Sequence, residues 1–327
     1  MIAPGLLRRS VRRASRWRVL LIWWATLVVP SAIAAIPAFV LLRARLDHST
    51  RAPEAVAWMD GATAIDLVRQ LAAKGASESL LLGSIGALLM LLVTAPFASG
   101  AMVAAAGEGE PLPFPRLLAG AGALYGRMLR CGLLGLVPLG LAAAVAAGIT
   151  KLALRANEGV STETTANRNL ALAAVAAGAV LFLAHLLVDA ARAQFAAEPE
   201  GRSAAAAFLS AARLLARRPL RSAAVGALGA AAGLGAAAGL MALRLHIAQA
   251  GPAGIALAWL LAQAARVAIG WGRAMRIEGL AELSRAVAAG RARSEAAPGP
   301  SAAGPQADVV HSATLSALEP PRSAAPR

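Results

Sequence analysis

Long apolar runs with few charges are the feature that most restricts how this chain can fold. Six of them occur, at residues 19–42, 80–105, 131–154, 170–191, 222–243 and 252–271. A helix rises about 1.5 Å per residue, so about 20 apolar residues cross the roughly 30 Å hydrocarbon core of a bilayer. The chain is 58% hydrophobic and only 15% charged, against about 25% charged residues in soluble domains. The sequence therefore predicts an all-α, polytopic membrane bundle of six transmembrane helices.

The positions of the arginines indicate how these helices are oriented. Arginines are concentrated before residue 19, within 106–130 and 192–221, and after residue 272, whereas the alternate connections carry fewer positive charges. Because positively charged connections stay on the cytoplasmic side, both termini are predicted to be cytoplasmic. An alternative is that the Ala- and Gly-rich fifth run is re-entrant, which would leave five spans and put the tail outside. The arginine pattern disfavours that alternative.

This topology divides the chain into a basic cytoplasmic segment at 1–18, a six-span membrane domain at 19–276 and a cytoplasmic tail at 277–327. The tail is rich in Ala, Pro, Ser and Gly, and it is predicted to be disordered from about residue 294. Residues 43–79 form an external loop with Ile65, Val68 and Leu71 at helical spacing. Residues 106–130 and 192–221 form cytoplasmic loops.

The first apolar run has a second interpretation as a cleaved signal peptide. It follows a basic segment, and Ala32-Ile-Ala34 resembles a processing site. The apolar stretch reaches Leu42, however, and so exceeds the length of a signal-peptide core, which is about 7 to 15 residues. The length favours an uncleaved signal anchor.

Each cytoplasmic loop contains an amphipathic segment, at 115–130 and at 203–220. In the second, Ser203 can cap a helix, and Phe208, Leu209, Ala212 and Leu215 share one helical face, opposite Arg213 and Arg217. Such a helix lies in the membrane interface and directs its arginines toward anionic lipid headgroups. A polar connection packed on the end of the bundle is an equally supported interpretation. The predicted headgroup contacts are Arg127, Arg130, Arg213, Arg217, Arg218 and Arg221.

These two loops belong to a duplicated unit. At one constant offset, Arg127-Met-Leu-Arg130 aligns with Arg218-Pro-Leu-Arg221, and Gly135 aligns with Gly226. In both copies a span enters the cytoplasm, a short turn with Glu and Gly follows, and the amphipathic segment leads into the next span. The pattern predicts an internal repeat in parallel orientation.

Ionisable residues occur in the fourth apolar run, near its cytoplasmic end. His185 and Asp189 share a helix face, and Asp189 lies three residues before Arg192, close enough to pair with it. Ionisable groups within spans are functional candidates, so one hypothesis is a proton or cation relay. The favoured hypothesis makes Asp189 an interfacial anchor that also binds Arg266, with His185 donating to a neighbouring carbonyl, because an ion pathway usually holds more than one deep acid. The candidate intramembrane network is His185, Asp189, Arg192 and Arg266.

The fifth run contains two small-residue patterns, Gly229-x-x-x-Gly233 and Gly235-x-x-x-Gly239. Helices in lipid have little hydrophobic drive to associate, so close backbone approach through small residues stabilises their packing. All four glycines are therefore predicted to pack against neighbouring helices of this chain. Homodimerisation through them is the weaker alternative.

Signatures of catalysis, metal binding and cofactor binding are missing from the sequence. The four histidines are far apart, Cys131 is the single cysteine, and neither a phosphate loop nor a nucleophile elbow occurs. A net charge of +15 is typical of nucleic-acid binding, but the arginines flank apolar runs and no polar domain carries aromatic residues for base stacking. We therefore expect no catalytic, metal-binding or cofactor-binding residues and no nucleic-acid partner.

One resemblance to known proteins rests on these same residues. Asp189-x-Ala-Arg192, the polar turn and amphipathic segment after it, and Arg217-Arg-Pro219 resemble a group of uncharacterised bacterial six-span inner-membrane proteins. The earlier half, with Ser99-Gly100 and an amphipathic segment ending in Arg127-Met-Leu-Arg130, is similar too. The layout of 80–243 is more distantly similar to the membrane domain fused to some glycerophosphodiester phosphodiesterases. The resemblance implies a six-span fold and a bacterial inner membrane, and it brings no activity and no catalytic residues.

Three hypotheses about function follow. The favoured one is a non-enzymatic integral membrane protein whose cytoplasmic amphipathic segments engage anionic lipid or a protein partner. The alternative is a transporter with a pathway between the second to fifth spans. A membrane-bound enzyme that acts on lipid has the least support, because no acid, base or metal set converges in the sequence.

Overall fold

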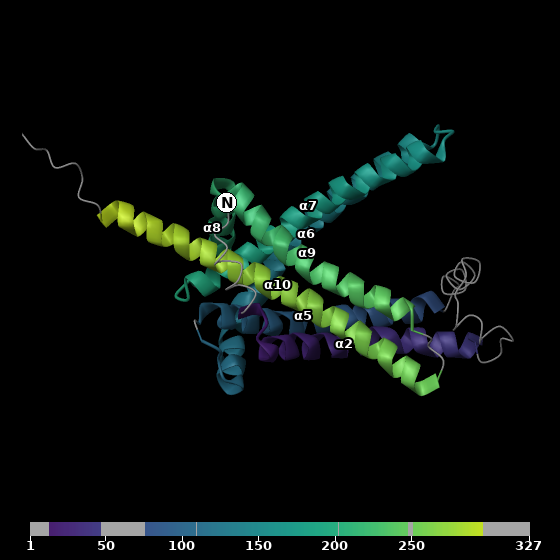
Figure 1. The fold of residues 1–327 in the computed structure, drawn as a ribbon, viewed down its shortest axis with the longest axis horizontal. Coiled ribbons are helices and arrows are strands. Elements are labelled where there is room, and N and C mark those ends of the chain that lie inside the picture. Colours follow the sequence, from purple (N-terminus) through teal and green to yellow (C-terminus); the bar gives the residue numbers. More distant parts are fainter. Residues whose placement is uncertain (1–12, 47–75, 109, 202, 248–250, 297–327) are drawn as a thin grey trace, which may run out of the picture. The chain divides into compact units, whose positions relative to one another are not determined.

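The computed structural model describes residues 13–46, 76–108, 110–201, 203–247 and 251–296. In these ranges the chain forms seven α-helices and no strand (Figure 1): α2 (Trp17–Leu46), α5 (Ala76–Gly107), α6 (Phe114–Asn157), α7 (Glu163–Ala197), α8 (Ala204–Arg217), α9 (Pro219–Leu245) and α10 (Gly251–Ala296). The predicted surface helix around 65–71 and the tail beyond 296 lie outside the described residues.

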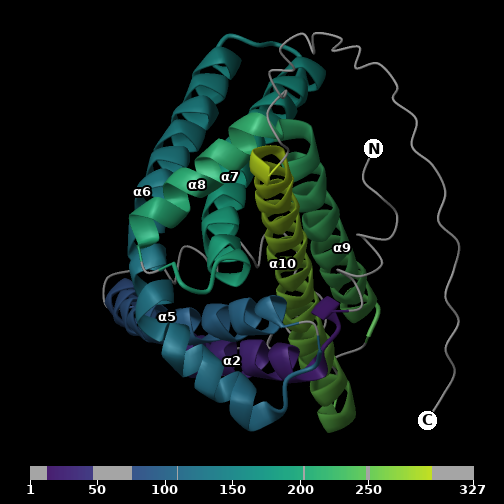
Figure 2. The same ribbon diagram turned by 90° about the vertical axis from the view of Figure 1, so that its left-hand side faces the viewer.

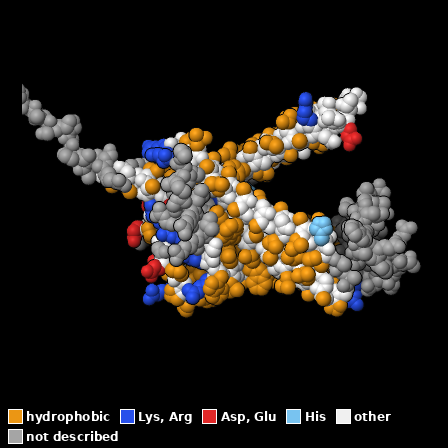
Figure 3. Space-filling model, viewed as in Figure 1, with side chains coloured by type: hydrophobic (Ala, Val, Ile, Leu, Met, Phe, Trp, Pro, Cys, Tyr) orange, Lys and Arg blue, Asp and Glu red, His pale blue; other side chains and the backbone are white. Residues whose placement is uncertain are grey.

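Six of these seven helices are long and apolar enough to cross a membrane, and α8 is the exception. Their surfaces carry large hydrophobic side chains, among them Leu82, Val137 and Val175, which are 70%, 71% and 71% exposed. In Figure 3 hydrophobic side chains cover the flanks of the helices, while charged side chains gather toward the helix ends. Apolar surface on this scale is stable where hydrocarbon covers it. The six predicted apolar segments are confirmed as helices long and apolar enough to cross a membrane.

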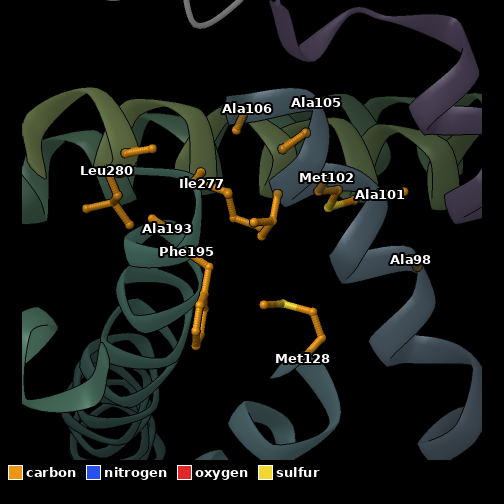
Figure 4. Packing of buried hydrophobic residues seen from close by; sticks show 14 of the residues in the cluster. Ala98, Ala101, Met102, Ala105, Ala106, Met128, Ala193, Phe195, Ile277 and Leu280 are labelled. Carbon is orange, nitrogen blue, oxygen red and sulfur yellow. The ribbon is translucent and has the colours of Figure 1, made fainter. Parts of the chain in front are cut away.

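Most helices pack against their neighbours in the sequence. α2 lies against α5, α6 pairs with α7, and α8 rests on α7 and α6 (Figure 2). α9 and α10 run side by side in both ribbon views. The buried core lies where α5, α6, α7 and α10 meet, and it consists largely of alanine (Figure 4). The larger residues in it include Met102, Met128, Phe195, Ile277 and Leu280. The many small side chains let the helix backbones approach closely, which stabilises helix packing in lipid.

The first predicted amphipathic segment does not form a helix of its own. Residues 115–130 are continuous with the third span in α6, whereas 203–220 forms α8 and the start of α9. The helix of the second segment is interrupted at Arg218. The backbone of this residue (φ −134°, ψ 51°) leaves the helical region just before Pro219. Proline disfavours a helical residue before it, and Met128, which aligns with Pro219 in the predicted repeat, has no such effect. The repeat itself stays a prediction.

α10 continues well beyond the sixth predicted span. The sequence predicts a span that ends at 271 and a tail from 277, but the helix runs to Ala296, and Ile277, Leu280 and Ala281 are fully buried. These three positions recur at the spacing of one helix face, so that face enters the core. Residues through Val287 therefore belong to the same compact unit as the spans.

Candidate functional site

Asp189 lies at the centre of a buried ion cluster near the end of α7. Its side chain is 3% exposed, and Arg192 Nη1 donates to its Oδ1 at 3.2 Å. From α10, Arg273 Nε donates to the same oxygen at 3.4 Å. Arg276 donates to Oδ2 through Nε at 3.1 Å, and its Nη2 lies 2.9 Å from that oxygen. These four residues, here named the Asp189 cluster, join α7 to α10 through charge-assisted hydrogen bonds.

Trp23 of α2 lies beside the Asp189 cluster. The Arg273 guanidinium lies 5.3 Å from the centroid of the Trp23 ring, in a cation–π contact. Trp23 Nε1 donates to the Arg266 carbonyl at 3.1 Å. The ring also packs against Gly270, where any Cβ atom would collide with it. Glycine at position 270 therefore lets the indole contact α10 beside the cluster.

Arg266, the predicted partner of Asp189 on the sixth span, binds elsewhere. Its Nη1 donates to Gln263 Oε1 at 3.3 Å, and within the described ranges no ion pair joins it to Asp189. The α10 partners are instead Arg273 and Arg276, further along the helix. The sequence pattern misses them because the apolar run ends before them. Arg273 and Arg276 are three residues apart on one helix face, and the apolar residues Ile277 and Leu280 continue that face. This pattern could have identified the two arginines as partners of Asp189.

His185 does not join the cluster. The side chain is exposed on α7, and its Nδ1 lies 3.0 Å from the Leu181 carbonyl oxygen on its own helix. Asp189 is buried one turn further on, so the two predicted members of a relay face different surroundings. Of the predicted network, the structure brings together Asp189 and Arg192.

A second set of arginines closes the C-terminal end of α5. Arg16 Nη1 donates to the Ala105 carbonyl at 2.7 Å, and Arg285 Nη2 donates to the Ala106 carbonyl at 2.8 Å. The last carbonyls of a helix have no partner inside it and carry partial negative charge, so guanidinium groups stabilise them. Burial lowers the pKa of Arg16 from its ordinary value, although a guanidinium remains protonated at neutral pH. The sequence alone predicts only an orienting role for both arginines.

Two polar contacts hold the extended part of α10. Arg13 Nη1 donates to Glu282 Oε1 at 3.1 Å, and Gln194 Nε2 of α7 donates to Ser284 Oγ at 3.1 Å in a buried contact. An unpaired buried polar group costs about 1–3 kcal/mol, so partners at these positions favour one register of α10 over others.

Basic side chains lie on the surface of α8 and of its junction with α9. Ser203 caps α8 by accepting a hydrogen bond from the Ala206 N–H at 3.3 Å. The helix buries one face, formed by Ala204, Ala207, Ala211 and Leu214. Phe208 and Leu215, predicted to share a face with Leu209, are half-buried against the core, whereas Leu209 is exposed. The exposed set, here named the α8–α9 surface, comprises Leu209, Arg213, Arg217, Arg218, Leu220 and Arg221.

The two remaining predicted headgroup arginines lie on α6 and differ in their surroundings. Arg127 Nη1 donates to the Pro199 carbonyl at 2.7 Å and so joins α6 to the turn between α7 and α8. Arg130 is exposed, and its Nε donates to the Gly126 carbonyl at 3.1 Å. Arg130 also lines an open groove of about 680 Å³ between α6 and α8, whose other lining residues are Leu133, Leu134, Val137, Ser203, Ala204 and Ala205.

Two of the four predicted packing glycines lie where α9 meets α10. A Cβ atom at Gly229 would lie 2.8 Å from the Gly272 carbonyl oxygen, and one at Gly233 would lie 2.9 Å from Gly272 Cα. At Gly235 and Gly239 a Cβ atom would meet nothing within 4 Å. The first Gly-x-x-x-Gly pattern is therefore at a helix contact, and the second has no neighbour among the described residues.

The described residues contain no group of three or more His, Cys, Asp or Glu side chains placed to hold a metal ion. Comparison of the chain with protein-family models, with curated proteins and with solved structures gives no match. The resemblance to bacterial six-span proteins therefore stays a prediction. What bears on function is the geometry of the Asp189 cluster and of the α8–α9 surface.

Proposed function

We propose that this protein is a non-enzymatic, multi-pass protein of the bacterial inner membrane, with both termini in the cytoplasm, that binds anionic phospholipid headgroups through the α8–α9 surface. The supporting observation is the mixture of side chains there: Leu209 is 53% and Leu220 is 84% exposed beside four exposed arginines. At a membrane interface such leucines enter the boundary of the acyl chains while the guanidinium groups contact phosphates. α8 is thus an amphipathic interfacial helix in this proposal.

The arginines of this surface are available for lipid. Within the described residues no acidic side chain forms a salt bridge with Arg213, Arg217, Arg218 or Arg221. Each arginine near an anionic leaflet contributes about 1 kcal/mol, so the four together contribute about 4 kcal/mol, less at high ionic strength. That attraction favours the contact of α8 with an anionic leaflet.

The groove between α6 and α8 suits the same ligand. Leu133, Leu134 and Val137 follow Arg130 along one face of α6, at the spacing of helix neighbours. A phospholipid beside this wall would place its acyl chain on the leucines and its phosphate near the Arg130 guanidinium. The groove thereby extends the proposed lipid contact from the α8–α9 surface to α6.

The test compares hydrogen exchange of α8 amides in nanodiscs made of phosphatidylcholine alone with exchange in nanodiscs that also contain phosphatidylglycerol. We expect anionic lipid to slow exchange in the natural protein and to have little effect when Arg213, Arg217 and Arg218 are replaced by Gln. The matched control replaces Lys151, Arg155 and Arg168 by Gln, because it removes the same charge from the predicted external side.

The control variant should keep the response of α8 to anionic lipid. Equal exchange in the two lipids for the natural protein would refute the proposed headgroup binding. A protein partner that protects α8 equally well in phosphatidylcholine would replace lipid as the ligand of this surface.

A transporter, the alternative from the sequence, receives less support from the geometry. Among the described residues, Asp189 forms ion pairs only with arginines, and His185, the other member of the hypothetical relay, lies outside the cluster. A relay needs a second titratable group within reach of the first. Proton-coupled uptake into vesicles that disappears in Asp189→Asn would reverse this preference.

A further inference from the structure

The Asp189 cluster contains more positive than negative charge. Three guanidinium groups surround one carboxylate, and their side chains are only 14% (Arg192), 17% (Arg273) and 18% (Arg276) exposed. Within the described residues no second acid lies within 4 Å of them. A buried charge without a counter-charge is costly, so two largely buried positive charges remain to be neutralised.

The hydrogen bonds in the cluster are also incomplete. Each guanidinium has five N–H donors, and Asp189 engages only some of them. Arg192 Nε is fully buried and has no hydrogen-bond partner among the described residues. Arg273 uses Nε toward Asp189, which leaves both of its Nη groups without a hydrogen bond in that part of the chain. The open donors and the excess charge call for the same kind of ligand, an anion with several oxygen acceptors.

The position of the cluster narrows the class of anion. Trp17, the first residue of α2, is 64% exposed. Trp23 contacts Arg273 of the cluster, and Trp271 lies two residues before Arg273 in the sequence. Tryptophan rings favour the headgroup level of a bilayer, where the phosphate groups of lipids also lie. For a chain placed in the membrane as proposed above, the cluster is therefore at the depth of phosphate oxygens.

We propose that the Asp189 cluster binds a phosphate-class oxyanion, which accepts hydrogen bonds from Arg192, Arg273 and Arg276 and neutralises their excess charge. Arginine suits this ligand because its planar fork of donors matches phosphate oxygens. The phosphate belongs either to a lipid headgroup or to a free phosphate ion, and the two share this chemistry. The site is distinct from the α8–α9 surface, because it joins α7 to α10 in the interior of the helix bundle.

The test measures thermal unfolding of the delipidated full-length protein in an uncharged detergent. Inorganic phosphate is titrated against sodium chloride of equal ionic strength, which removes general screening effects. In parallel, phosphatidylglycerol is titrated against a neutral glycolipid that lacks phosphate. A ligand that binds only the folded state raises the unfolding midpoint in a saturable way. A saturable rise with either phosphate probe supports the proposal when it persists after Arg213, Arg217 and Arg218 are replaced by Gln. The probe that saturates first then identifies the source of the phosphate.

Three variants localise the effect. Arg192→Gln should raise the half-saturating concentration by about tenfold, the usual weight of one hydrogen bond to a charged group. Arg168→Gln, at an exposed position on the same helix, should respond like the natural protein. In the inorganic phosphate titration, the triple substitution of Arg213, Arg217 and Arg218 should do so as well. In the phosphatidylglycerol titration it should lose the contribution of the α8–α9 surface and keep a saturable rise that depends on Arg192, which separates the two sites.

Asp189→Asn gives the sharpest contrast with a purely structural salt bridge. Because the carboxylate competes for the same guanidinium groups, its removal should lower the half-saturating concentration of the anion. Weaker binding by this variant would overturn the proposal. The same conclusion would follow if neither phosphate probe raised the midpoint above its control, or if Arg192→Gln and Arg168→Gln responded alike. If Asp189→Asn does not fold, the comparison of those two arginine variants decides.

Discussion

The contact of α9 with α10 allows a sharp test of how these helices pack. Gly233 and Gly235 lie two residues apart on α9, but only one of them touches α10. A Cβ atom at Gly233 would lie 2.9 Å from both the Ala268 carbonyl oxygen and Gly272 Cα, whereas one at Gly235 would meet nothing within 4 Å. The atoms near Gly233 are backbone atoms, which cannot rotate away as a side chain can. Gly233→Ala and Gly235→Ala are thus the same chemical change with and without a steric conflict.

The magnitude follows from two opposing effects. Alanine is about 1 kcal/mol more favourable than glycine inside a helix, and this gain applies to both variants. Overpacking a close contact costs about 1–3 kcal/mol, and this cost applies to Gly233→Ala alone. The two variants should therefore differ by about 1–3 kcal/mol in the free energy of unfolding, with Gly235→Ala the more stable.

The assay is reversible unfolding in a lipid-like detergent, followed by the fluorescence of the tryptophans. Gly229→Ala would place its Cβ atom 2.8 Å from the Gly272 carbonyl oxygen but closer still to the Arg276 side chain, so it tests the same helix contact together with the Asp189 cluster. Equal stability of Gly233→Ala and Gly235→Ala would show that α9 and α10 do not meet at Gly233.

Three further outcomes are expected. Ser203→Ala removes the N-cap of α8 and should cost about 1 kcal/mol, measured as faster hydrogen exchange in its first turn. Arg285→Gln leaves the Ala106 carbonyl at the end of α5 without its guanidinium partner and should lower the unfolding midpoint, at a cost of about 1–3 kcal/mol. For topology, a cysteine replacing Asp60 should react with an impermeant thiol reagent from outside the cell and one replacing Gly201 only from inside; the native cysteine is buried. Labelling of both from the same side would refute the predicted orientation.

Local features could be predicted from the sequence because their cause is local. Each span is a run of apolar residues, and a helix satisfies its own backbone hydrogen bonds in hydrocarbon, so length and composition suffice. The start of α8 at Ser203 has a similarly local cause, a side-chain oxygen that accepts a backbone hydrogen bond. The pairing of Asp189 with Arg192 also has a local cause, because the two residues are three positions apart on one helix.

Features that depend on how the helices rotate and cross could not be predicted from the sequence. Arg266, Arg273 and Arg276 all lie on α10, and which of them reach Asp189 depends on the depth and rotation of α10 against α7. The two Gly-x-x-x-Gly patterns of α9 are equivalent in composition, yet only Gly229 and Gly233 face α10. A glycine in the sequence indicates that two helix backbones can approach closely there, but it does not indicate where the neighbouring helix lies.

The sequence by itself determined that this chain forms six helices long and apolar enough to cross a membrane and a shorter helix capped by Ser203, because hydrophobic transfer and helix capping act on consecutive residues. Only the tertiary structure decided that residues 277–287 of α10 belong to the core and that three arginines gather around one aspartate. The physical reason is that burial and ion pairing join residues far apart in the chain, and their partners are set by how whole helices pack.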